Sequence, residues 1–324
     1  MSENQESLAN LGHENRLFPP SAAFSAQANA QASMYDEAEK DRLAFWEKQA
    51  HALQWDAPWT QVLDWQAPFA KWFVGGKINA SVNALDRHVN EGRGDRVAFF
   101  FEGEPGDTRT ITYAQMLTEV KKTANALTEL GIKDGDRVAI YMPMIPEAAI
   151  AMLACARIGA PHSVVFGGFA SVNLAQRIDD AAPKVIICAD AGSRAGKVTP
   201  YKPLLDKAIS LSTRPPEHVI VVDRGLFEFE PVAGRDLDYA TLRAKHDGAK
   251  VPVAWLESSA PSYVLYTSGT TGKPKGVMLS ASNLLHNVRH LAVELRCSDG
   301  MRGVNWLPPY HDMGLIAGIL MPLY

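Results

Sequence analysis

From residue 96 onward, two patterns of apolar residues alternate along the chain. Short apolar runs, typical of strands buried on both faces, are followed by stretches in which apolar residues recur every three or four positions, typical of helices. The expected strands are 97–101, 138–141, 163–166, 185–188, 219–222 and 263–266. The expected helices are 112–130, 146–158, 171–181, 202–211 and one that carries Leu284, Val288, Leu291 and Leu295. This alternation predicts an α/β fold with a mostly parallel, doubly wound sheet and flanking helices.

Single residues sharpen some of these boundaries. Thr112 and Gln115 have the spacing of a helix capping box, and Gly131 is placed to end the same helix. Residues 276–279 are expected to form a return strand after 263–266. Residues 223–260 are polar and rich in turn formers, without a clear period, and are expected to form a long connection.

Before residue 96 the pattern is less regular. Residues 1–33 are polar and rich in Ala, Ser and Asn, which favours a flexible arm. Residues 35–53 have a helical pattern, with Leu43, Trp46, Ala50 and Leu53 on one face. Four more tryptophans follow at positions 55, 59, 65 and 72. We expect them to anchor an irregular segment on a core rather than to stack on a ligand.

Composition is that of a globular protein. The 324 residues are 47% hydrophobic with a formal net charge of −4, which gives no electrostatic reason to expect a nucleic-acid partner. The longest apolar run, 148–156, is too short to span a bilayer, and no signal peptide is evident. Cys155, Cys188 and Cys297 lie far apart and are expected to be buried thiols in a reducing compartment, which favours a cytoplasmic location.

The most distinctive stretch is 266–276, Tyr-Thr-Ser-Gly-Thr-Thr-Gly-Lys-Pro-Lys-Gly, at the end of an expected strand. Its glycines let consecutive N–H groups point into one concavity, while hydroxyls and lysines add donors and positive charge, which favours a polyphosphate ligand. Composition alone fits a solvated hairpin loop equally well. A P-loop is disfavoured, because the glycines are too closely spaced and Pro274 follows Lys273 where a hydroxyl residue would bind magnesium.

Over its whole length this stretch resembles the phosphate-binding loop of the acyl-adenylate-forming enzymes, such as acyl-CoA synthetases and fatty acyl-AMP ligases. The resemblance implies the N-terminal portion of the adenylate-forming fold and ATP as a substrate. It places these residues at the ATP phosphates: Thr267, Ser268, Gly269, Thr270, Thr271, Gly272, Lys273 and Lys275. Activating a carboxylate with ATP expels pyrophosphate, so donors and cations near the β- and γ-phosphates suit the reaction. We assign no catalytic residue here.

A second candidate site combines two segments, Phe166-Gly167-Gly168 and Arg194-Ala195-Gly196-Lys197. By chemistry alone they are a tight turn and an exposed basic loop, although the two cations could hold a phosphate. Residues 34–277 resemble acetyl-CoA synthetase, in which the matching basic segment contacts the nucleotide phosphate of coenzyme A and the Phe-Gly-Gly segment lies beside it. The resemblance therefore implies a coenzyme A site here. Lysine at position 197, where the motif also occurs with arginine, weakens bidentate contact.

The segment 306–314, Trp-Leu-Pro-Pro-Tyr-His-Asp-Met-Gly, supplies a third candidate. His311 can hydrogen-bond or titrate near neutral pH, and either caps a loop or lies on the acyl or adenylate side of the site. This segment and residues 282–286 resemble fatty acyl-AMP ligases. Residues 278–324 therefore favour a different branch of the family, and a longer acyl chain, than residues 34–277.

The resemblance divides the chain into three parts: a flexible arm (1–33), an acetyl-CoA-synthetase-like N-terminal cap (34–92) and an incomplete AMP-binding domain (93–324). The chain ends on an apolar run, without the family's adenine-binding segment, its acidic ribose and magnesium ligands, or its C-terminal domain. We therefore expect an N-terminal fragment. Mg²⁺ is an expected cofactor whose ligands lie in the missing part.

The expected function is ATP-dependent activation of a short-chain carboxylate, acetate first, to an acyl-AMP, followed by transfer to coenzyme A. This is an acid–thiol ligase reaction, and a small carboxylate is the expected partner. One alternative is a fatty acyl-AMP ligase that loads a carrier-protein thiol. Another is a catalytically silent nucleotide-binding fragment. The sequence leaves the oligomeric state open.

Overall fold

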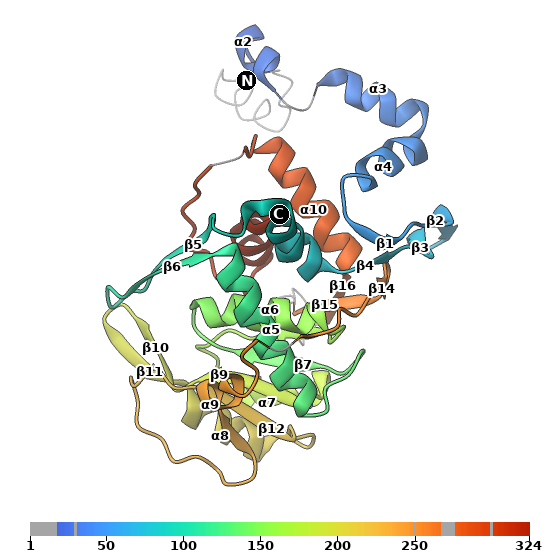
Figure 1. Cartoon of the computed structure of the whole chain (residues 1–324). Helices are drawn as coiled ribbons and strands as arrows, with labels where there is room; N and C mark the ends of the chain where they lie inside the picture. Colours follow the sequence, from blue (N-terminus) through green and yellow to red (C-terminus); the bar gives the residue numbers. More distant parts are fainter. Residues whose placement is uncertain (1–17, 29–30, 249, 267–275, 299–300) are drawn as a thin grey trace, which may run out of the picture.

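The computed structural model describes residues 18–28, 31–248, 250–266, 276–298 and 301–324. At its centre lies a seven-stranded sheet (Figure 1). Its strands, in spatial order, are β13 (Asp236–Asp238), β12 (His218–Val222), β9 (Val185–Ala189), β7 (Val138–Tyr141), β8 (His162–Val164), β15 (Pro261–Tyr266) and β16 (Gly276–Ser280). All neighbours from β13 to β15 are parallel, and only β16 runs antiparallel to its neighbour. The predicted α/β fold with a mostly parallel sheet is confirmed.

Helices cover both faces of this sheet. One face packs against α5 (Tyr113–Glu129), α6 (Pro146–Arg157), α9 (Tyr239–Ala244) and α10 (Ala281–Glu294), and the other against α7 (Ser171–Ala181) and α8 (Tyr201–Leu211). Side chains of β9 alternate between the two cores: Ile187 lies in the first, Ile186 and Cys188 in the second. Because both faces are buried, these strands are continuous apolar runs rather than alternating ones.

The predicted helix boundaries are set by local hydrogen bonds. The Thr112 side chain accepts from the N–H of Gln115, and the Gln115 side chain accepts in return from the N–H of Thr112. Gly131 follows the helix with a φ of +79°, a conformation that glycine adopts at little cost. Ser280 and Asn283 form a second such box at the start of α10. The capping box and the glycine stop predicted for α5 are both confirmed.

Smaller elements surround the central sheet. A three-stranded sheet contains β1 (Trp55–Ala57), β4 (Lys77–Ile78) and β14 (Leu256–Glu257). Three hairpins pair β2 (Gln61–Gln66) with β3 (Phe69–Val74), β5 (Val97–Glu102) with β6 (Thr108–Thr112), and β10 (Ala191–Arg194) with β11 (Lys197–Pro200). Further short helical segments are α2 (Ala22–Gln27), η1 (Val82–Asp86), η2 (Val89–Arg93), η3 (Met313–Leu320) and α11 (Met321–Leu323). The short helix α2, within the predicted arm, buries none of its residues.

The single helix predicted over residues 35–53 is wrong. The structure has two, α3 (Ala32–Lys40) and α4 (Arg42–Ala50), which are separated at Asp41. Asp41 has an extended backbone, and its carboxylate accepts from the N–H of Ala44, so it caps α4 instead of continuing α3. On α4 the buried residues are Phe45 and Ala50, whereas Leu43 is exposed.

Three further expectations need correction. Residues 223–260 are not only a connection, because they contain β13, α9 and β14. These elements are too short to show a period of their own. Cys155 and Cys188 are buried as expected, but Cys297 is exposed. The strand expected at 163–166 lies at His162–Val164, which leaves Phe166 beyond its end.

Most of the tryptophans pack as the sequence predicts. The rings of Trp55 and Trp59 lie 5.0 Å apart, and each contacts Phe73. Trp46 contacts Trp72 at 6.5 Å and His286 of α10 at 4.4 Å, which ties the N-terminal segment to the main body. Trp65 departs from the prediction, since its side chain is largely exposed.

A search of the described residues for a helix of the length and apolarity needed to cross a bilayer finds none.

Candidate functional site

The predicted site segments follow the carboxyl ends of neighbouring parallel strands. Phe166 comes just after β8, the β10–β11 hairpin just after β9, and residues 267–275 just after β15. The chain passes from β7 to β8 on one side and from β8 back to β9 on the other, so the strand order reverses at this point. In open α/β sheets, ligands bind in the crevice at such a reversal.

The structure brings Phe166 and Arg194 together. The guanidinium of Arg194 lies 6.0 Å from the centre of the Phe166 ring. On the same ring packs Tyr310, with 4.6 Å between ring centres. Burial raises the pKa of Tyr310, and the charge of Arg194 opposes that rise. Three segments that are far apart in sequence therefore meet at one aromatic ring.

The segment from Arg194 to Lys197 is a two-residue hairpin turn rather than an open basic loop. Arg194 and Lys197 are paired across β10 and β11, while Ala195 and Gly196 between them have φ values of +52° and +70°. Two successive positive φ values are typical of the tight turns that join antiparallel strands. In the described part of the chain neither cation forms an ion pair, and both side chains are exposed. The turn therefore presents two cations to the solvent.

A carboxylate already contacts this turn. The N–H of Gly196 donates to Oε1 of Glu104, at 3.3 Å, from the tip of the β5–β6 hairpin. Figure 1 shows the two hairpins reaching toward each other. Because that N–H donates to an anionic oxygen here, it is oriented to donate to a phosphate oxygen as well.

Two glycines of the site are required by close packing. A Cβ on Gly167 would lie 2.4 Å from the ring of Tyr201, the first residue of α8. A Cβ on Gly168 would lie 2.6 Å from the ring of Phe166. The Tyr201 ring also closes over Gly192 of β10, where a Cβ would lie 2.5 Å from its hydroxyl. The Tyr201 ring therefore packs against both the segment after β8, at Gly167, and the β10–β11 hairpin, at Gly192.

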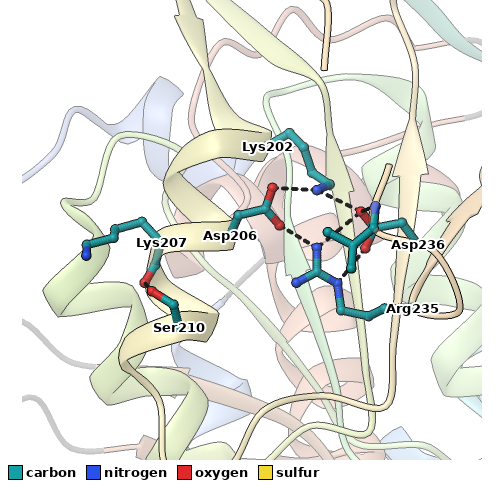
Figure 2. A network of polar contacts seen from close by, with 7 residues as sticks. Lys202, Asp206, Lys207, Ser210, Arg235 and Asp236 are labelled. Atoms are coloured by element: carbon teal, nitrogen blue, oxygen red, sulfur yellow. Dashed lines mark hydrogen bonds and ion pairs between the residues drawn. The ribbon is translucent and has the colours of Figure 1, made fainter. Parts of the chain in front are cut away.

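Figure 2 shows what holds the start of α8 in place. The fully buried Lys202 extends its ammonium to Asp206 at 2.6 Å and to Asp236 at 2.8 Å. Arg235 contacts the same two carboxylates. Burial raises the pKa of Asp236, but the hydrogen bonds from Arg235 and Lys202 outweigh it and hold the pKa below its usual range. This network ties α8 to the edge strand β13.

All the residues predicted to bind the ATP phosphates, 267–273 and 275, lie outside the described residues. The two ends of the stretch are described. Tyr266 pairs with Gly276 across β15 and β16, so residues 267–275 connect two antiparallel strands. The hydroxyl of Tyr266 donates to Asp180 of α7 at 2.6 Å, and burial together with Asp180 raises its pKa.

His311 lies at the protein surface, and its role on the acyl or adenylate side stays a prediction. Its side chain is 64% exposed, and its Nδ1 lies 2.6 Å from Oδ1 of Asp312. The neighbouring Tyr310 is the residue that contacts Phe166. Sequence reasoning selected the histidine because it titrates, and passed over the tyrosine in the same motif. Tyr201 and Glu104 were also missed, because neither has a neighbouring motif that would indicate its role.

Among the described residues, no group of three or more His, Cys, Asp or Glu side chains is arranged to hold a metal ion.

Two protein-family models match this chain. Residues 85–324 match the family model described as AMP-binding enzyme, and residues 31–84 match the one described as acetyl-coenzyme A synthetase N-terminus. The likeness of residues 278–324 to fatty acyl-AMP ligases stays a prediction, since a match that runs over 85–324 does not separate the branches of the family.

Individual relatives are similar over most of this chain. An acetyl-coenzyme A synthetase of Streptomyces avermitilis is 52% identical over 283 residues, which are 87% of this chain and 43% of the relative. One of Mycobacterium tuberculosis H37Rv is 54% identical, covering 83% of this chain and 42% of the relative. A propionate–CoA ligase of Salmonella typhimurium is 55% identical, covering 72% and 37%. This chain therefore spans less than half the length of these relatives.

A solved structure shares the fold. The acetoacetyl-CoA synthetase from Streptomyces lividans superposes with a TM-score of 0.81 over 95% of this chain and 50% of that one, at 25% sequence identity.

Proposed function

The chain belongs to the AMP-binding enzyme family, and on that premise we propose that it is the part of a short-chain acyl-CoA ligase that binds the ATP phosphates and coenzyme A. A carboxylate oxygen attacks the α-phosphorus of ATP, the bond to the β-phosphate breaks, and pyrophosphate leaves. The coenzyme A thiol then gives up its proton, its sulfur attacks the acyl carbon, and AMP leaves.

One observation carries this proposal: a tight turn bears two cations, Arg194 and Lys197, that form no ion pair among the described residues, and Arg194 contacts an aromatic ring at the reversal point of the sheet. A planar guanidinium and an ammonium beside an exposed N–H suit a phosphate monoester, because charge-assisted hydrogen bonds are the strongest that a protein offers. We propose that these groups bind the nucleotide phosphate of coenzyme A, with Phe166, Gly167, Gly168, Ala195 and Gly196 shaping the site.

The ATP phosphates are proposed to bind at residues 267–275, with Lys273 and Lys275 offsetting the charge of the pyrophosphate that leaves. Support comes from the described residues on either side of the stretch, since Tyr266 and Gly276 lie at the same sheet edge as Phe166 and the β10–β11 hairpin. His311 is proposed to lie on the acyl or adenylate side, one residue from Tyr310.

We propose acetate as the first carboxylate to test and propionate as the second, since relatives named for both are more than half identical to this chain. Among the described residues, no contact favours a carrier-protein acceptor. A silent nucleotide-binding chain remains an outcome of the experiment.

The test uses the complete polypeptide that contains residues 1–324. Carboxylate-dependent ATP–pyrophosphate exchange measures adenylation, and coenzyme A thioester formation measures the second step, each with acetate, propionate and octanoate. We expect the two short acids to support both reactions, and Lys273→Ala to reduce exchange more than stability. Octanoate as the preferred acid, or exchange without transfer to coenzyme A, would contradict the proposal.

A further inference from the structure

Between the two proposed ligand sites lies the half-buried Arg177 of α7. Its guanidinium carbon is 4.1 Å from the centre of the Phe169 ring and 5.4 Å from that of Tyr266. Both distances are within the range of cation–π contact. One side chain therefore contacts two aromatic rings at the carboxyl edge of the sheet, one at the end of β15 and one in the loop after β8.

The two rings lead to different sites. Tyr266 is the last residue before 267–275, the stretch proposed to bind the ATP phosphates. Phe169 packs edge to face on Phe166 with 5.4 Å between ring centres, and Phe166 in turn contacts Arg194. Arg177 is thus the middle member of a continuous chain of contacts from one site to the other.

The charge of Arg177 is not used for an ion pair within the described part of the chain. Nη1 donates a hydrogen bond to the carbonyl of Asn173, one turn earlier on the same helix, at 3.1 Å. The side chain is half-buried, and burial lowers its pKa. An arginine that only held α7 to the sheet would be expected to pair with a carboxylate, as Arg235 and Arg157 do.

The space around these contacts is nearly filled. The cavity lined by Arg177, Tyr266, Tyr141 and Ser163 has a volume of about 10 Å³, room for roughly one water molecule. Asp180, on the same helix, also holds the Tyr266 hydroxyl at 2.6 Å. Tyr266 is therefore held by two side chains of α7, Asp180 and Arg177, with little free space beside these contacts.

We propose that Arg177 is a positioning residue that couples the two ligand sites, by holding the Tyr266 ring at the ATP side and the Phe169 ring at the coenzyme A side in one arrangement. The proposal rests on the proposed function, because it assigns a role within that site. It names no contact of Arg177 with either substrate.

The experiment uses Arg177→Met in the complete polypeptide, which keeps the length of the side chain and removes the charge. Exchange without coenzyme A gives the KM for ATP, and thioester formation at saturating ATP gives the KM for coenzyme A. Both should rise, roughly three- to tenfold each, the size expected for loss of one partly desolvated cation–π contact.

The melting temperature and the KM for acetate should stay near those of the wild type. Arg177→Lys, which keeps the charge but not the planar group, should recover part of both losses.

Two further variants separate coupling from general damage. Phe169→Leu should raise the KM for coenzyme A alone, and it should add little when combined with Arg177→Met, because both remove the same contact. Gln176→Ala, an exposed neighbour on α7, is the matched control and should change neither constant.

The outcomes distinguish the coupling role of Arg177 from the proposed ligase function. If the wild type performs both reactions and Arg177→Met leaves both constants within about twofold of it, the coupling role is wrong while the proposed function stands. A loss of turnover with both KM values unchanged would likewise overturn it. A wild type with neither reaction would overturn the function and, with it, this role.

Discussion

Two groups of basic residues differ in what surrounds them. Lys202 and Arg235 are enclosed by Asp206 and Asp236, and every charge has a partner (Figure 2). Arg194 and Lys197, a few residues before, stand exposed at a hairpin turn, without a carboxylate partner in the part of the chain that the structure describes. The first group is internally neutralised, whereas the second needs an anion from outside.

This difference distinguishes a role in stability from a role in ligand binding, which amino-acid composition alone cannot distinguish. Removing the partner of a buried charge lowers the free energy of unfolding, so we expect the first group to matter for stability. An exposed charge contributes little to stability, so the second group is free to serve binding. Arg177 is an intermediate case, since aromatic rings rather than carboxylates hold it.

The largest effect is expected from Lys202→Met. The change removes the ammonium but leaves Asp236, 1% exposed, beside a single remaining cation. We expect a loss of about 3–5 kcal/mol in the free energy of unfolding, the usual result of breaking a buried pair on one side. Urea denaturation of the chain measures it.

Lys207→Ala is the control on the same helix, because Figure 2 shows Lys207 pointing away from the network. It should change the unfolding free energy by less than about 0.5 kcal/mol. Equal losses in the two variants would mean that the buried network has no special role.

A smaller effect should appear as a dependence on pH. The pKa of Asp236 is lowered on folding, so its contribution to stability is complete above the unfolded value of about 3.9 and is lost as the pH falls through the folded value. Asp236→Asn should therefore flatten the fall in stability in acid. Asp247→Asn, at a 77% exposed carboxyl paired with Lys122, should flatten it much less. Unfolding free energies measured from neutral pH down to about pH 3 compare the three proteins.

Gly167→Ala tests the link between the exposed basic turn and the buried network. Tyr201 lies against Gly167 and begins α8, the helix that carries Lys202. The new methyl group must displace the Tyr201 ring, and overpacking of this kind costs about 1–3 kcal/mol. The KM for coenzyme A should rise in the same variant. A stable variant with unchanged coenzyme A kinetics would show that the contact is not needed.

The smallest effect is expected from Glu104→Gln. Its carboxylate accepts from the Gly196 N–H, where an incoming phosphate would meet a like charge. Neutralising it should lower the KM for coenzyme A by about twofold, the scale of one exposed charge contact. A higher KM would instead mean that Glu104 supports the turn by holding it in shape.

Much of the fold could be predicted because its signals are local. The apolar runs of β7, β9 and β12 and the capping box at Thr112 each depend on a few neighbouring residues. Asp41 was missed because its preference for a cap competes with a helical pattern that continues past it. The strand β13 escaped prediction because it is short and is stabilised by its neighbour β12 and the buried network.

The site was predictable only as separate pieces. The sequence indicated Phe166 and Arg194 as candidates, but their contact depends on where β8 and β9 lie in the sheet. Tyr201, Tyr310 and Arg177 act through packing at a distance in sequence, and no pattern of neighbouring residues marks them. Residues 267–275 remain predicted from their motif alone.

The most direct measurement is the KM for coenzyme A in the complete polypeptide with Arg194→Ala and Lys197→Ala combined. We predict a rise of roughly tenfold or more, as expected for losing charge-assisted hydrogen bonds to a phosphate. The unfolding free energy and the KM for ATP should not change. An unchanged KM for coenzyme A, or a loss of stability like that of Lys202→Met, would contradict the division between the two groups of basic residues.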